Sequence, residues 1–173
     1  MQTISLDRYD LALLDALQRD GNATNAALGE SVHLSASQIS RRLQRLADTG
    51  LIAGFAALLD PEAIGLGVIA FAHVILEHHG QARSEAFENA VAIMPEVMKC
   101  LSVSGDADYL LRIVAPDLQA FSELMMKRVL RLPGVAHIKS NIALQKVKQT
   151  HVLPLDHIAQ PSRPRQQIRY AGD

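Results

Sequence analysis

The chain has 173 residues, 49% of them hydrophobic, which is enough for two small domains with a core each. Its single cysteine, Cys100, excludes an internal disulfide, and no apolar stretch approaches the ~20 residues of a membrane span. A formal net charge of −1 does not favour a nucleic-acid partner by itself, so such a function depends on where the charges lie.

The N-terminal third of the sequence predicts three helices. Asp7 is placed as the N-cap of the first, and Thr24 as the cap of a short second helix. Ser35 and Gln38 have the spacing of a capping box that starts the third. Three helices with a turn of about three residues between the second and third predict a helix-turn-helix. Residues 51–59 are expected to form an extended segment that leads away from it.

The remainder predicts a β-α-β unit that occurs twice. Met94-Pro95-Glu96-Val97 and Leu132-Pro133-Gly134-Val135 each end a helix with proline and start a strand with valine. This order is that of a ferredoxin-like βαββαβ fold, an antiparallel sheet with both helices on one face. We expect a second subunit to cover the other face. The expected strands are 68–76, 97–103, 109–114 and 135–147, and the expected helices are 85–94 and 118–132.

The third helix concentrates the positive charge of the N-terminal region. A recognition helix places its first turns against base edges and phosphates in the major groove, and arginine suits both contacts. The alternative is that these arginines are the solvated face of an amphipathic helix. The candidate DNA-binding residues are Ser35, Ser37, Gln38, Arg41, Arg42 and Arg45.

Several separated motifs occur in one order along the chain. They are Leu6-Asp7-Arg8-Tyr9-Asp10, Val32-His33-Leu34-Ser35, Arg42-Leu43-Gln44-Arg45-Leu46, Gly50-Leu51-Ile52, Gly105-Asp106-Ala107-Asp108-Tyr109-Leu110-Leu111, Arg131-Leu132-Pro133-Gly134-Val135 and Ser140-Asn141-Ile142-Ala143-Leu144. With these motifs, the chain from residue 5 to about 155 resembles the Lrp/AsnC family of feast-or-famine regulators. The resemblance implies dimers that often assemble further to octamers, and an amino acid or related metabolite bound between sensing domains. No cofactor is expected.

The sequence departs from the family pattern at three positions of the helix-turn-helix. His33 stands where the family often has glycine, and Ala36 where it often has proline. Histidine tolerates a left-handed backbone better than most residues, so we expect the turn to be kept. Gly29, inside the second helix, is expected to weaken that helix by up to about 1 kcal/mol.

For the effector, the sequence and the resemblance together indicate the turn between the central strands and the last strand. Gly105 lets the backbone bend sharply, and Asp106 or Asp108 could bind an ammonium group, with Ser140 nearby. The alternative is a plain turn in which each aspartate binds its own backbone.

Three rival interpretations stay open at this point. His73, His78, His79 and His137 could suggest a metal, but carboxylates at ligand spacing are missing, so no metal is expected. Sirohaem decarboxylases resemble the same two-domain layout and would be expected to use residues such as His73 and Arg112. A metabolite-binding module without DNA binding is the third, whereas the basic third helix favours a regulator that is not an enzyme.

The expected protein is therefore an α+β homo-oligomer that binds double-stranded DNA and a small amino-acid-like effector. No signal peptide is visible and no membrane partner is expected, so a cytoplasmic location follows. The expected domains are a (winged) helix-turn-helix over 1–52, a linker strand and hinge over 53–67, a ligand-sensing and oligomerisation domain over 68–153, and a flexible basic tail over 154–173.

Overall fold

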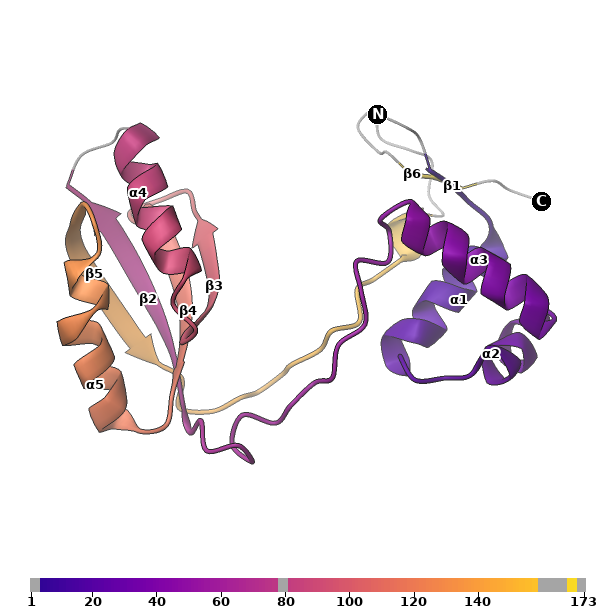
Figure 1. The fold of residues 1–173 in the computed structure, drawn as a ribbon, viewed down its shortest axis with the longest axis horizontal. Coiled ribbons are helices and arrows are strands. Elements are labelled where there is room, and N and C mark those ends of the chain that lie inside the picture. Colours follow the sequence, from indigo (N-terminus) through magenta and orange to yellow (C-terminus); the bar gives the residue numbers. More distant parts are fainter. Residues whose placement is uncertain (1–3, 78–80, 159–167, 171–173) are drawn as a thin grey trace. The chain divides into compact units, whose positions relative to one another are not determined.

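The computed structural model describes residues 4–77, 81–158 and 168–170 (Figure 1). It divides the chain into two compact units. The N-terminal unit comprises residues 1–57 and 148–173, and the C-terminal unit comprises residues 58–147.

The N-terminal unit contains the expected helix-turn-helix. Both predicted capping boxes are present: Asp7 with Asp10 starts α1, and Ser35 with Gln38 starts α3. Thr24 caps α2 by accepting a hydrogen bond from the backbone N–H of Ala27. The elements of this part are β1 (Ile4–Leu6), α1 (Arg8–Arg19), α2 (Asn25–Val32) and α3 (Ala36–Asp48).

The turn between α2 and α3 explains two of the departures from the family pattern. His33 adopts the left-handed conformation at φ 59°, so the turn is kept, as expected. Gly29 is buried, and a Cβ atom there would lie 2.4 Å from the carbonyl oxygen of Leu34. Close packing of the turn on the helix therefore requires glycine at this position.

The C-terminal end of the chain joins the N-terminal unit. The side chain of Gln18 accepts a hydrogen bond from the backbone N–H of Leu153 and donates one to its carbonyl oxygen. Ile158, in the 3₁₀ helix η2 (Asp156–Ile158), is buried among the leucines of α1, α2 and α3. Strand β6 (Ile168–Tyr170) runs parallel to β1.

This placement differs from the expected boundary after residue 153 and the expected flexible tail. The tail looks polar and proline-rich in sequence, but Leu155 and Ile158 supply enough apolar surface to pack on the helix-turn-helix core. Part of the tail, including Arg163 and Arg165, lies outside the described residues.

The C-terminal unit has the predicted βαββαβ order. Its sheet is antiparallel throughout, with the strand order β3-β4-β2-β5, as in a ferredoxin-like fold. Helix α4 follows β2, and α5 follows β4. The elements are β2 (Val68–Leu76), α4 (Gln81–Ala92), β3 (Val97–Ser102), β4 (Tyr109–Ala115), α5 (Leu118–Lys127), the 3₁₀ helix η1 (Val129–Arg131) and β5 (Val135–Ile142).

Side chains alternate strictly along β2. Val68, Ala70, Ala72, Val74 and Leu76 are buried against both helices, together with residues such as Phe87 of α4 and Phe121 of α5. The intervening residues point to the opposite side, where Phe71 and Ile75 are 38% and 36% exposed. We call this side the open face, because no helix of the described residues packs on it.

The expected ends of three elements were wrong, and the expected linker strand is absent from the described residues. Strand β5 ends at Ile142, which pairs with Ala70, rather than at residue 147, because β2 extends only two residues beyond Ala70 and cannot pair with a strand of that length. The segment 51–59 is not hydrogen-bonded into a strand, so the described residues contain no wing there. Helix α4 begins at Gln81, and the last expected helix ends at Lys127, before a separate 3₁₀ turn.

A last observation concerns helix length. No helix within the described ranges is long and apolar enough to cross a membrane.

Candidate functional site

The exposed surface of α3 begins with its capping residues. Ser35, Ser37, Gln38 and Arg41 are all exposed, and the Ser35 and Ser37 hydroxyls lie 3.1 Å apart. In the part of the chain that the structure describes, Arg41 has no carboxylate partner. The first two turns of α3 thus present hydroxyl, amide and guanidinium groups to solvent.

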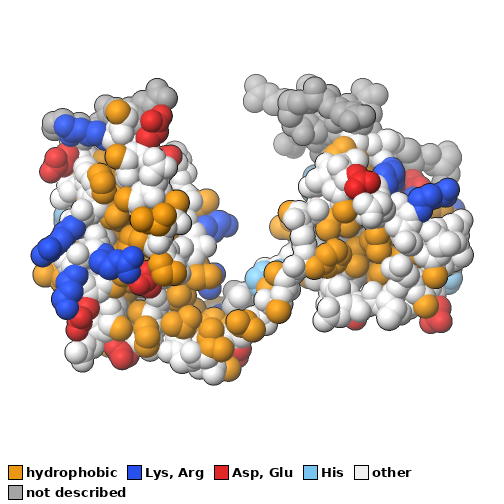
Figure 2. Space-filling model, in the orientation of Figure 1, with side chains coloured by type: hydrophobic (Ala, Val, Ile, Leu, Met, Phe, Trp, Pro, Cys, Tyr) orange, Lys and Arg blue, Asp and Glu red, His pale blue; other side chains and the backbone are white. Residues whose placement is uncertain are grey.

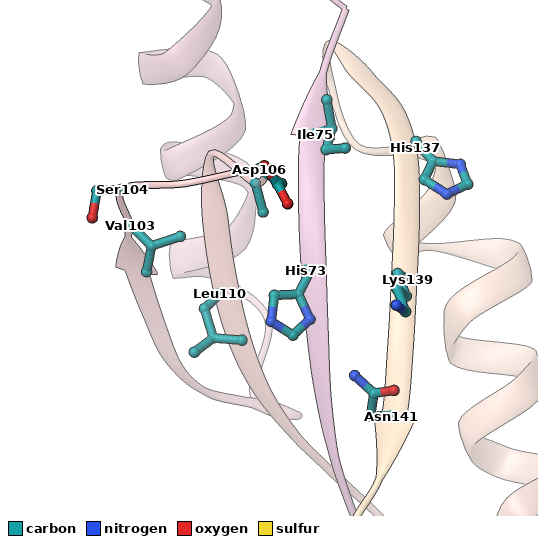
Figure 3. Close-up of a pocket in the computed structure, with 10 residues that line it drawn as sticks. His73, Ile75, Val103, Ser104, Asp106, Leu110, His137, Lys139 and Asn141 are labelled. Atoms are coloured by element: carbon teal, nitrogen blue, oxygen red, sulfur yellow. The ribbon is translucent and has the colours of Figure 1, made fainter.

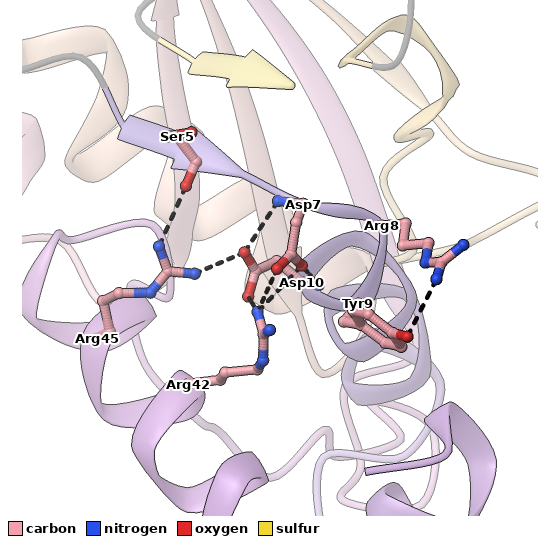
Figure 4. A network of polar contacts seen from close by, with 7 residues as sticks. All are labelled: Ser5, Asp7, Arg8, Tyr9, Asp10, Arg42 and Arg45. Atoms are coloured by element: carbon pink, nitrogen blue, oxygen red, sulfur yellow. Dashed lines mark hydrogen bonds and ion pairs between the residues drawn. The ribbon is translucent and has the colours of Figure 1, made fainter. Parts of the chain in front are cut away.

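Arg42 and Arg45 are arranged differently, because both contact the buried carboxylate of Asp10 on α1 (Figure 4). Arg42 Nη1 lies 2.6 Å from Asp10 Oδ1, and Arg45 Nη2 lies 2.5 Å from Asp10 Oδ2. Arg42 also contacts Asp7 at 2.8 Å, and Arg45 donates to the carbonyl oxygen of Ser5. We call Asp7, Asp10, Arg42 and Arg45 the carboxylate clamp.

The environment of Asp10 favours its charged form. Burial alone would raise the pKa of this carboxyl, but hydrogen bonds from Arg45, from the backbone of Asp7 and from Arg42 together lower it below its usual value. The pKa of Arg42 is raised, since its burial is outweighed by Asp10 and Asp7. The clamp is therefore ionised at neutral pH.

A cavity of about 510 Å³ lies on the open face of the C-terminal unit (Figure 3). His73 and Ile75 of β2 and His137, Lys139 and Asn141 of β5 form one wall, since the register pairs His73 with Lys139 and Ile75 with His137. The other wall is formed by Leu110 of β4 and the connection before it, which supplies Val103, Ser104, Asp106 and Ala107.

The cavity combines charged groups of both signs with an apolar lining. Asp106 and Lys139 provide a carboxylate and an ammonium group, and Ile75, Val103 and Leu110 provide the apolar surface. The Nδ1 atom of His73 is buried without a hydrogen-bond partner. Such an atom favours a ligand or water at this position, because an unpaired buried polar atom is unfavourable.

The structure brings only one of the four residues predicted for the effector to this cavity. Asp106 lines it, but Gly105, Asp108 and Ser140 are not among the described residues that do. Ser140 pairs with the buried Ala72, so it lies on the helix side of the sheet. Asp108 accepts a hydrogen bond from the backbone N–H of Leu76 at the end of β2, so it ties the connection to a neighbouring strand rather than to its own backbone.

Gly105 has the backbone freedom that the sequence predicted, with φ at 118°. It lies in the connection that presents Asp106, so its role in the structure is to shape that connection.

Comparisons with known protein families find one matching domain in each of the two units. Residues 6–47 match the AsnC-type helix-turn-helix domain, and residues 69–153 match the Lrp/AsnC ligand binding domain. The DNA-binding transcriptional activator DecR of Escherichia coli is 37% identical over 151 residues, covering 87% of this chain and 99% of the relative. The chain belongs to the Lrp/AsnC family.

Further relatives and solved structures are similar to this chain over most of its length. The leucine-responsive regulatory protein of Escherichia coli is 36% identical over 148 residues, which are 86% of this chain and 90% of that protein. The crystal structure of a transcriptional regulator from Neisseria meningitidis in complex with L-methionine gives a TM-score of 0.85 at 39% identity, covering 88% of this chain and 98% of the other. An AsnC family regulator from Agrobacterium tumefaciens gives 0.84 at 33% identity, covering 88% and 99%.

Membership of the Lrp/AsnC family decides between the interpretations of the sequence. The protein is a DNA-binding transcriptional regulator with an amino-acid ligand-binding domain, and it is not an enzyme of the sirohaem decarboxylase type. No group of three potential metal ligands is present among the described residues, which exclude His78 and His79. His73 lines the cavity instead.

Of the ten residues that line the cavity, sequence reasoning assigned only Asp106 to the effector, and it also missed the carboxylate clamp. His137, Lys139 and Asn141 alternate along the last strand, and this alternation was the available signal that they share one face. Asp10 was placed correctly in the first turn of α1, but no local pattern indicates that two arginines more than 30 residues away contact it.

Proposed function

We propose that the chain regulates transcription by placing the exposed first turns of α3 in the major groove of double-stranded DNA. The observation that carries this proposal is that Ser37, Gln38 and Arg41 are exposed on one continuous surface, with Arg41 unpaired by any carboxylate of the described residues. Ser35, Arg42 and Arg45 belong to the same surface, but they are also engaged within the protein.

Arg41→Ala tests this proposal in a fluorescence titration with a duplex from the region upstream of the protein's own gene. Loss of a base contact should weaken binding by about 1–3 kcal/mol and relax sequence preference, whereas loss of a phosphate contact should weaken all sequences alike. Arg19→Ala is the matched control, because Arg19 is an exposed arginine of α1 in the same unit. Equal affinities of Arg41→Ala and wild type would contradict the proposal.

We further propose that the effector is a small amino acid held in the cavity of the C-terminal unit. Asp106 is suited to bind the ammonium group, and Lys139, with His73 or His137 beside it, is suited to bind the carboxylate. Ile75, Val103 and Leu110 would then contact an apolar side chain. The names of two relatives support this choice, since one is leucine-responsive and the other is complexed with L-methionine.

Isothermal titration with a panel of amino acids identifies the effector and tests the site. Asp106→Asn and Lys139→Met should each reduce affinity for the effector at least tenfold, because each removes one charge partner. Ser140→Ala is the control on the opposite side of the same strand. If Ser140→Ala abolished binding and Lys139→Met did not, the ligand would lie where the sequence predicted it.

We also propose that the protein is a homodimer, and that its open face lies at the interface. Apolar residues of this face are exposed, and so are Phe55, Leu58, Leu59 and Leu144 of the connecting segments 53–67 and 143–152. Figure 2 shows these segments as a run of hydrophobic side chains. An exposed apolar surface of this extent is typical of an interaction site.

Light scattering on residues 68–147 at micromolar concentration tests whether the sheet associates by itself. The expected mass is at least that of a dimer, and a monomer would contradict the proposal. The same measurement on the full chain tests the octamer implied by the family resemblance. Because DNA is the partner, the cytoplasm is the location that we propose.

A further inference from the structure

We propose that Asp10 is a positioning residue that restrains Arg42 and Arg45 and thereby limits their non-specific attraction to DNA phosphates. The inference rests on the proposed contact of α3 with DNA and assigns different roles to its three arginines. Arg41 is the arginine available to DNA, whereas Arg42 and Arg45 are held by the aspartates of the carboxylate clamp.

Two arginines of α3 share the buried carboxylate of Asp10. Asp10 is 1% exposed, and each of its oxygens contacts a different arginine, at 2.6 and 2.5 Å. Arg42 is only 23% exposed and contacts Asp7 as well. Both oxygens of one buried side chain thus fix two residues of α3 that are one helical turn apart.

Positive and negative charges nearly balance around the exposed surface of α3. Asp7, Asp10, Arg41, Arg42 and Arg45 line one depression in the surface, together with Ser5. Three arginines and two aspartates leave a single net positive charge there, and it corresponds to Arg41. A phosphate would have to compete with carboxylates for Arg42 and Arg45.

The competition between a phosphate and the carboxylates for Arg42 and Arg45 is unfavourable for the phosphate. Taking either arginine from Asp10 leaves one oxygen of a buried carboxylate without its charged partner, which is unfavourable. The low pKa of Asp10 also keeps the clamp ionised under the conditions of DNA binding. Arg42 and Arg45 therefore stay with Asp10, and base contacts rather than backbone attraction decide where α3 binds.

Asp10→Asn in the full chain tests the inference, because asparagine keeps the shape of the side chain and removes its charge. Dissociation constants are measured over a range of salt concentrations for a duplex from upstream of the gene and for a scrambled duplex. For the scrambled duplex, the slope of log Kd against log salt should steepen by about 0.9 for each arginine that gains a phosphate. The preference for the specific duplex should fall several-fold.

Two variants separate this role from a simple change of charge. Asp15→Asn removes an exposed acid from the same helix, whose only ion-pair partner among the described residues is Arg19 of α1, so its slope should stay at the wild-type value. Arg42→Gln added to Asp10→Asn removes a released arginine, so the slope should return toward wild type. A purely structural role for Asp10 would not produce this reversal.

The outcomes distinguish the inference from the function on which it rests. If Asp10→Asn leaves the slope unchanged, lowers it, or changes it no more than Asp15→Asn does, the inference is overturned while DNA binding stands. If wild type binds neither duplex, the proposed DNA contact itself fails. If Asp10→Asn does not fold, Asp7→Asn carries the same expectation with a smaller steepening, because Asp7 contacts Arg42 and asparagine is an equally good N-cap.

Discussion

Replacing Gly29 with alanine should destabilise the N-terminal unit, although alanine is the better helix former. Alanine gains about 1 kcal/mol over glycine inside a helix. Its Cβ, however, would lie 2.4 Å from the carbonyl oxygen of Leu34, a backbone atom that can move only with the whole turn. Overpacking of this kind costs about 1–3 kcal/mol, so we expect a net loss of up to about 2 kcal/mol.

The loss should be visible as a lower midpoint in thermal unfolding followed by circular dichroism. For a unit of this size, 1 kcal/mol corresponds to a shift of about 4–8 °C. Ala27→Gly, at an exposed position of the same helix, is the control and should lose up to about 1 kcal/mol from propensity alone. DNA affinity of Gly29→Ala should fall too, because the displaced turn leads directly into α3. A Gly29→Ala variant more stable than wild type would refute the packing argument.

Three further predictions concern single residues. His33→Gly should be neutral or stabilising by up to about 1 kcal/mol, since glycine adopts φ near 59° without strain, whereas His33→Val should be clearly destabilising in the same melting assay. The pKa of Asp10 is lower in the folded protein than its value near 3.8 in the unfolded chain, so its ion pairs stabilise the folded unit at pH values above 3.8. This stabilisation is lost as pH falls through the folded pKa. Between pH 7 and pH 3 the melting temperature should therefore fall more steeply for wild type than for Asp10→Asn. Tyr109→Phe should lower stability by about 0.5–1.5 kcal/mol in urea unfolding, because it removes the hydrogen bond that the buried Tyr109 hydroxyl donates to Glu88 at 2.6 Å; unchanged stability would show that this hydrogen bond contributes nothing beyond what water supplies to the exposed carboxylate.

Local chemistry explains why so much of the fold follows from the sequence. A capping box needs only two residues at fixed spacing, so Ser35 and Gln38 locate the start of α3 by themselves. The repeated proline and valine pattern likewise marks both helix-to-strand transitions of the C-terminal unit. Strand ends, unlike helix starts, are not determined by local sequence, because the end of β5 depends on where its partner β2 begins.

The candidate sites follow from the sequence less completely. The six DNA-binding candidates lie on the surface of α3 because helical spacing alone places them there. For the effector, the sequence indicated the connection that carries Asp106, but the family motif drew attention to Ser140 rather than to Lys139. The two residues are adjacent, and only strand register decides which of them reaches the open face.

The sequence by itself determined the helices, their caps, the order of the strands and the family, because these depend on neighbours within a few residues. Tertiary structure alone decided that Asp10 binds Arg42 and Arg45, that Ile158 joins the helix-turn-helix core, and that Lys139 and Asp106 line the same cavity. Each of these arrangements brings together residues more than 30 positions apart. Such contacts form only when packing brings distant segments together, and the local pattern of neither segment carries that information.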